Sequence, residues 1–143
     1  MEISQVRRRT REAIEQWKRT SAERRIRQDA AARAWTEVLT TTVVPIAHQL
    51  VQGLRAEGYS VGVFTPADRV RIGSERSGEN YVELSLESDG GDGVLVARSS
   101  RQRGRETIAE ERVVVRGADA IATLGEEEVL AHLLESLAKV LER

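Results

Sequence analysis

The sequence predicts an α+β protein of two layers, in which helices cover one face of an antiparallel sheet. Three observations lead to this fold class. Apolar residues recur at helical spacing in the first part of the chain, alternate with polar residues through the middle, and return to helical spacing at the end. The connections between the alternating runs are short, which favours an antiparallel meander. We therefore expect a long kinked N-terminal helix, four or five strands and a C-terminal amphipathic helix.

Residues 1–34 are predicted to be helical but to bury little of their surface. The segment has no Gly or Pro and is rich in helix-forming residues. Its apolar stripe is thin, since only Val6, Ala13 and Trp17 recur at roughly helical spacing. We accordingly divide the chain into a polar, basic helical extension at residues 1–30 and a single α+β domain at residues 31–143.

The helix gains a core-facing side after residue 30. Apolar side chains follow the three- and four-residue spacing of an amphipathic helix from Ala31 to Leu54. Pro45 lacks a backbone donor, and the β-branched run from Thr40 to Val44 disfavours a helix. We therefore predict a kink near residues 41–45, or two helices that meet there.

Alternation of apolar and polar residues predicts the strands. The clearest turn is the run from Asp89 to Gly93, which is expected to close a hairpin. Residues 101–105 are predicted to form a second connection. The polar alternates Glu83, Ser85 and Glu87 leave one face of the sheet solvated or open to a partner. The alternating runs lie at residues 59–65, 70–72, 81–87, 94–98 and 107–116.

The last helix has the strongest pattern. A continuous apolar stripe runs from Val129 to Leu141. Thr123 and Glu126 match the spacing of a capping box, and the glutamates at 126–128 would complement the positive end of the helix dipole. The sequence thus predicts a helix that begins near Glu126.

Composition narrows the function classes. The chain has 143 residues, with 22 Lys and Arg against 23 Asp and Glu, and it contains no Cys. Without Cys, disulfides, thiolate catalysis and zinc sites of the Cys type are excluded. No apolar run approaches the roughly 18 residues that span a bilayer, and none follows the N-terminal arginines as in a secretory signal. We expect a cytoplasmic protein that does not enter a membrane.

The net charge of −1 hides an asymmetry along the chain. Residues 1–57 carry a net charge of +4, residues 58–117 a net charge of −1, and residues 118–143 a net charge of −4. The basic and the acidic segments are therefore expected either to pair with each other or to face different partners.

The inventory of catalytic groups is sparse. His48 and His132 lie on or beside predicted apolar helix faces, and a Glu128–His132 pair would supply only two metal ligands. A metal-dependent nuclease site usually has a Lys or His beside its carboxylates. The carboxylates of Asp68, Glu83 and Glu87 have neither residue near them in the sequence. We expect no enzymatic activity, no cofactor and no metal site.

Two function hypotheses remain. The first is a non-enzymatic interaction or adaptor subunit, which binds a protein partner or a second copy through its Arg-rich helix and, in addition, through the open sheet face. Aromatic residues and Arg are enriched at the energetic centres of interfaces, which draws attention to Trp17. The candidate partner-binding residues are Arg7, Arg8, Arg11, Trp17, Arg24 and Arg25.

The second hypothesis is a nucleic-acid-binding accessory protein. A basic hairpin tip can follow a phosphate backbone, and the Arg7–Arg11 cluster could add to it. No aromatic residue lies among the Arg clusters, so the stacking platform of single-strand binders is missing. The candidate residues for this alternative are Arg98, Arg101, Arg103 and Arg105.

Overall fold

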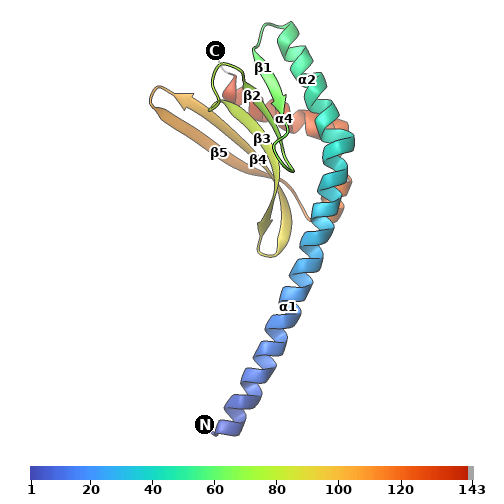
Figure 1. The fold of residues 1–143 in the computed structure, drawn as a ribbon, viewed down its shortest axis with the longest axis vertical. Helices are drawn as coiled ribbons and strands as arrows, with labels where there is room; N and C mark the ends of the chain where they lie inside the picture. Colours follow the sequence, from blue (N-terminus) through green and yellow to red (C-terminus); the bar gives the residue numbers. More distant parts are fainter. Residues whose placement is uncertain (142–143) are drawn as a thin grey trace.

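The computed structural model describes residues 1–141 and has the predicted α+β architecture. A helical segment opens the chain, a five-stranded antiparallel meander follows in the order β1-β2-β3-β4-β5, and two helices close it. Figure 1 shows the sheet beside the long helical segment, with the N-terminus far from the sheet. The helices are α1 (Ile3–Val38), η1 (Leu39–Val43), α2 (Val44–Ala56), α3 (Ala118–Ala122) and α4 (Glu126–Val140), and the strands are β1 (Val61–Phe64), β2 (Val70–Ser74), β3 (Tyr81–Asp89), β4 (Asp92–Arg103) and β5 (Glu106–Arg116).

The predicted kink is a single π-helical turn, η1, between α1 and α2. Pro45 has no backbone N–H and its ring would crowd the carbonyl of Thr41, so a regular α-helix is disfavoured here. The hydroxyl of Thr41 donates to the carbonyl of Glu37, and that of Thr40 to the carbonyl of Thr36. Threonine side chains thus supply hydrogen bonds along the turn where the regular ladder changes.

The π turn also shifts the phase of the apolar face by one residue. In an uninterrupted α-helix the buried stripe through Ala31, Trp35 and Val38 would continue at positions 42 and 45. The buried side chains are instead those of Val43 and Ile46. The extra residue in η1 therefore turns the apolar face of α2 back toward the sheet.

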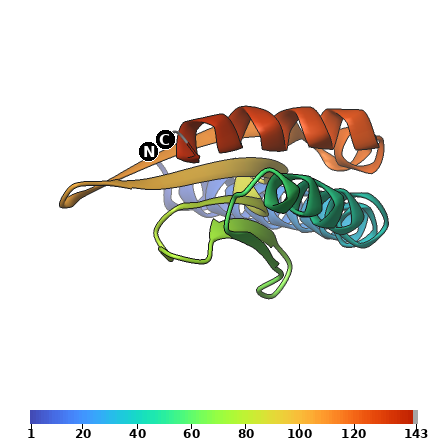
Figure 2. The same ribbon diagram turned by 90° about the horizontal axis from the view of Figure 1, so that it is seen from above.

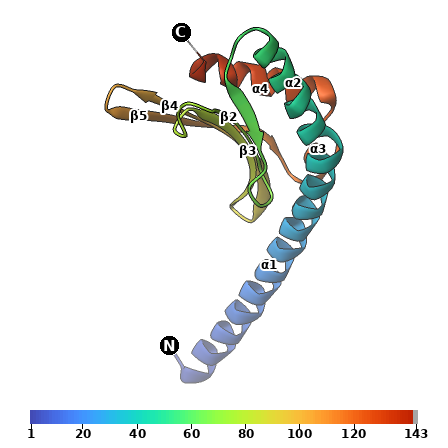
Figure 3. The ribbon, with the colours of Figure 1, turned by 45° about the horizontal axis from the view of Figure 1, so that its top comes forward.

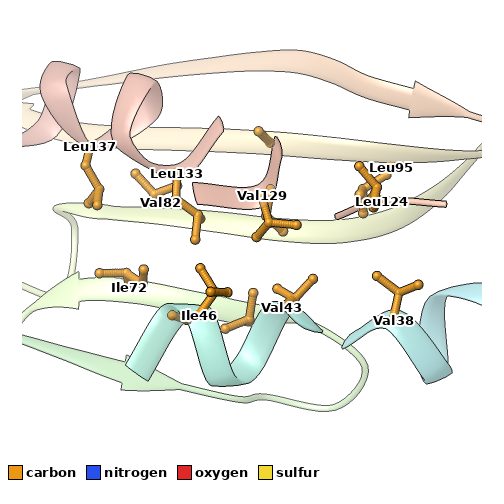
Figure 4. Close-up of a cluster of buried hydrophobic side chains, with 14 of the residues drawn as sticks. Val38, Val43, Ile46, Ile72, Val82, Leu95, Leu124, Val129, Leu133 and Leu137 are labelled. Atoms are coloured by element: carbon orange, nitrogen blue, oxygen red, sulfur yellow. The ribbon is translucent and has the colours of Figure 1, made fainter. Parts of the chain in front are cut away.

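The helices cover one face of the sheet, as the sequence predicts. The contacts of α2 lie on β1 and β2, and those of α4 lie on β3 and β4. Figure 2 shows α4 and α2 lying side by side, and Figure 3 shows the sheet next to both helices. One continuous core joins all these elements, and Figure 4 shows Val43 and Ile46 on the helical segment, Val82 and Leu95 on strands, and Leu133 on α4 converging in it.

Two local predictions are wrong. Thr123 does not cap α4, because its hydroxyl donates to the carbonyls of Asp119 and Ala120 at the end of α3, and Gly125 precedes the first turn of α4. Residues 101–103 belong to β4 rather than to a loop, and the turn is Gly104-Arg105. Beyond the helices both faces of this hairpin are polar, so no burial pattern marks it as a strand.

Candidate functional site: the projecting segment of α1

The body of the protein holds α1 only from Arg24 onward. Gly93 lies against Ala31 so closely that a Cβ there would overlap the methyl group of Ala31. The amide of Gln28 donates to the hydroxyl of Ser88 over 2.8 Å, and Arg27 pairs with Asp92 at 3.3 Å. All these groups lie at or near the β3–β4 turn, which is therefore the last support of the helix.

The turn itself is built for close approach. Asp89 of β3 and Asp92 of β4 are register partners in the hairpin. The two residues between them, Gly90 and Gly91, have φ of 61° and 91°. Two consecutive residues at positive φ define a tight hairpin turn that glycine adopts without strain. A Cβ on Gly91 would lie 2.6 Å from Cγ of Arg24, so the turn packs directly under this side chain.

Residues 3–23 of α1, which we call the projecting segment, extend beyond the turn. Within residues 1–141 the side-chain hydrogen bonds of this segment stay within the helix, from Thr10 to the carbonyl of Val6 and from Gln16 to Thr20. At 1.5 Å per residue the segment is about 30 Å long. Figures 1 and 3 show it leaving the body as a straight rod that no other element accompanies.

An apolar stripe runs along the projecting segment in line with the buried face of the same helix. Trp17 precedes Ala31 by two steps of seven residues, which brings both to nearly the same side of an α-helix. Trp17 is 65% exposed, although Trp35 further along the helix is 1% exposed. We define the apolar stripe as Ile3, Val6, Ala13, Ile14 and Trp17.

The charges on the projecting segment are sorted by face. At about 100° per residue, Arg7 and Arg9 lie on the two borders of the apolar stripe, and Lys18 and Arg25 continue one of them. The acidic residues of the segment, Glu12, Glu15 and Glu23, lie toward the opposite side. In residues 1–141 neither Arg7 nor Arg9 has an ion-pair partner. The stripe is therefore bordered by unpaired positive charge.

The candidate residues from the sequence divide over both sides of the helix. Arg7, Trp17, Arg24 and Arg25 lie on the stripe or its borders, and Arg24 also covers the β3–β4 turn. Arg8 precedes Trp17 by nine residues, about two and a half turns, and so lies on the opposite side.

Arg9 and Ile3 are not among the partner-binding residues predicted from the sequence, which places Arg9 only in the Arg7–Arg11 cluster of the nucleic-acid alternative. Counting helical positions backward from Trp17 would have found both. Arg11 lies about a third of a turn from the stripe and is the least directly placed of the candidates on that side.

The four arginines of the nucleic-acid alternative do not form one cluster. Arg98 lies on the sheet face without helices, where it pairs with Glu111 and, at 3.8 Å, with Glu87. The hydrogen bond with Glu111 raises the pKa of Arg98 above its ordinary value. Because strand residues alternate between faces, Arg101 points to the other side, where it lines a hollow with Lys139 at the end of α4.

Of these four arginines, the two at the tip of the hairpin have exposed side chains. Arg103 and Arg105 are both exposed there, on either side of Gly104. Glu106 of β5 is the register partner of Arg103 and offsets part of their positive charge. The tip is therefore a smaller basic feature than the sequence indicated.

Paired charges cover part of the sheet face without helices. Glu83 is 2% exposed and accepts hydrogen bonds from Arg69 at 2.9 Å and from Arg71 at 2.6 and 2.8 Å. The guanidinium of Arg71 also lies 4.0 Å from the centroid of the Tyr81 ring. This cluster fills only part of the face, because Phe64 of β1 and Val113 of β5 lie on the same face and are 48% and 52% exposed.

Two of the residues considered for catalysis, His132 and Asp68, form hydrogen bonds with other parts of the fold. Nδ1 of His132 lies 2.7 Å from the guanidinium of Arg112, and His48 is exposed on α2. The carbonyl of Asp68 accepts a hydrogen bond from the indole of Trp35 over 2.6 Å. In the part of the chain that the structure describes, no group of three or more metal-binding side chains comes together.

Comparison with known proteins gives no match from which a function could be transferred. No protein-family model, no curated protein and no solved structure matches this chain. Within residues 1–141, no helix combines the length and the apolar character needed to cross a bilayer.

Proposed function

We propose that this protein is a non-enzymatic interaction subunit that binds a protein partner through the projecting segment of α1. One observation carries the proposal: a stripe that contains an indole with 65% exposure continues the buried face of the same helix, and no other element among residues 1–141 packs on it. Exposed apolar surface of this kind is typical of a binding site. An amphipathic helix binds by laying its apolar face in a groove of the partner.

The charge pattern defines the chemistry of the partner. Arg7 and Arg9 border the stripe, so the complementary surface has an apolar centre and acidic surroundings. Glu12, Glu15 and Glu23 point away from it, which avoids repulsion from those surroundings. Trp17 lies at the centre of the contact in this proposal, because buried aromatic anchors dominate interface energies.

The test compares two substitutions of exposed apolar residues on opposite sides of α1. Trp17→Asp is expected to abolish a stoichiometric complex with an acidic partner purified from the native source. Ile26→Asp is the matched control, since Ile26 is 69% exposed and lies about two and a half turns beyond Trp17. Circular dichroism spectra of both variants should match that of the parent chain. Equal loss of the complex in both variants, or in neither, would contradict the proposal.

A second candidate function is nucleic-acid binding, which the exposed Arg103 and Arg105 favour. Binding through phosphate contacts weakens steeply with salt, and replacing both residues by Ala should then weaken binding to all sequences alike. Gel-shift titrations at low and moderate salt separate the two functions, because Trp17→Asp would leave this binding unchanged.

A further inference from the structure

We infer that the partner surface for the projecting segment is the outer face of α4 in a second copy of this chain. This inference rests on the proposed function and identifies its partner. The basic apolar stripe needs an acidic surface with an exposed apolar centre. Within the described residues of this chain, that combination occurs on α4.

The outer face of α4 carries one large exposed apolar side chain among small and acidic ones. Leu134 is 47% exposed, although Leu133 and Leu137 on the inner side of the helix are 1% and 3% exposed. Ala131 and Ala138 are exposed at the neighbouring helical positions. We call Glu127, Ala131, Leu134 and Ala138 the outer crest of α4.

Acidic residues dominate the surroundings of the outer crest. Glu127 stands on the crest, and Glu128 and Glu135 follow one of its borders, where Glu135 also pairs with Arg112 at 3.6 Å. The one basic residue of α4, Lys139, is engaged with Glu110 at 2.9 Å. The crest therefore has the charge opposite to that of the helix borders at Arg7 and Arg9, and electrostatic attraction would set which surfaces meet.

The two surfaces also agree in length and shape. The apolar stripe from Ile3 to Trp17 and the helix α4 each comprise fifteen residues, about 21 Å. Small residues at a helix contact allow two helix axes to approach closely. Ala131 and Ala138 thus leave room beside Leu134 for the indole of Trp17.

The contact has to form between two molecules. The projecting segment continues the straight course of α1 away from the body, and Figures 1 and 3 place its N-terminus at the far end of the molecule from α4. The helix would have to break to reach its own α4. Two copies that exchange their projecting segments would satisfy both surfaces of each chain, which gives a closed dimer.

The experiment is a charge exchange on the full chain, read as molar mass by light scattering behind size exclusion. At about 100 µM in low salt we expect twice the chain mass of 15.9 kDa. Arg7→Glu with Arg9→Glu, and separately Glu127→Arg with Glu128→Arg, should each weaken dimerisation at least about tenfold. A chain with all four substitutions should recover it. Arg8→Glu with Arg19→Glu makes the same charge change on the opposite side of α1 and should leave the dimer intact.

Three results would overturn the inference. They are a monomer at every concentration, a dimer that neither exchange weakens, and a dimer that the α1 exchange alone weakens without recovery by the α4 exchange. Each of these leaves the proposed function open to its own test, because a different acidic partner could still require Trp17. Loss of that complex in both Trp17→Asp and Ile26→Asp would instead remove the proposed function.

Discussion

At the scale of single residues, Gly93 shows how tightly the body grips α1. Its hydrogen atom faces Ala31, and a methyl group there would overlap the Ala31 side chain. We expect Gly93→Ala to destabilise the fold by about 1–3 kcal/mol, since overpacking forces the turn and the helix apart. Gly53→Ala is the matched control, because a Cβ at this helical position meets nothing within 4 Å. It should stabilise the protein by about 0.5–1 kcal/mol. Urea unfolding measures both, and equal signs would contradict the account.

Glu83 tests whether the charged layer on the sheet is a structural unit. Its side chain is 3% exposed, and removing it takes the buried carboxylate from Arg71 and leaves Arg69 with only Asp68, at 4.0 Å. We expect Glu83→Ala to cost about 2–3 kcal/mol, at the low end for a broken buried pair because both arginines are partly exposed. Glu87→Ala removes a 44% exposed carboxylate and should cost less than about 1 kcal/mol. Urea titrations that gave similar losses for both would count against a buried network.

At the scale of elements, α1 joins two parts of unequal stability. From Gln28 to Val38 it packs on the turn and the core, whereas the projecting segment has only its own backbone hydrogen bonds and local side-chain contacts. Isolated helices of this length are marginal in water. We expect amide hydrogen exchange in dilute solution to be fast before Ser21 and slow after Gln28. Uniform protection along α1 at concentrations where the chain is monomeric would contradict this expectation.

The elements also show which features a sequence reveals. The stripe from Val129 to Leu141 and the Asp89–Gly93 turn were predictable, because burial and turn geometry leave direct marks in residue type. The extension of β4 to Arg103 was not, because a hairpin that leaves the helices has no buried side to produce alternation. The capping box failed because Thr123 found nearer acceptors at the end of α3.

The candidate site was predictable in part. Trp17 stood out in the sequence because it is a large aromatic residue among charges. The position of the β3–β4 turn on the helix decides two further features of the site. It aligns the stripe around Trp17 with the buried Ala31, and it sets Arg24 as the first residue of α1 that the body contacts. That contact joins residues far apart in sequence, so no local pattern records it. The same is true of the acidic outer crest of α4, whose exposure depends on how the helix lies on the sheet.

At the scale of the whole molecule, the two tryptophans report on different events. Trp35 is 1% exposed and donates to the carbonyl of Asp68, so it senses the shared core. In Trp17→Phe, we expect fluorescence to shift to the red in one cooperative urea transition. In Trp35→Phe, the emission of the 65% exposed Trp17 should be red-shifted already in the monomer and move to the blue on docking. A blue-shifted Trp17 in the monomer would mean that the indole is covered within one chain.

The attachment of α1 at one end only also makes it a lever. Its pivot is the contact of Arg24 with Gly91, and its tip, Ile3, lies about 30 Å away. A swing of about 10° at the pivot moves the tip by roughly 5 Å, while the side chains near Ala31 scarcely change position. The volume that the tip sweeps enlarges the target for a first collision. The mean direction of the projecting segment is fixed by the core, because the core holds the other end of α1. The geometry of the final complex therefore depends on the core.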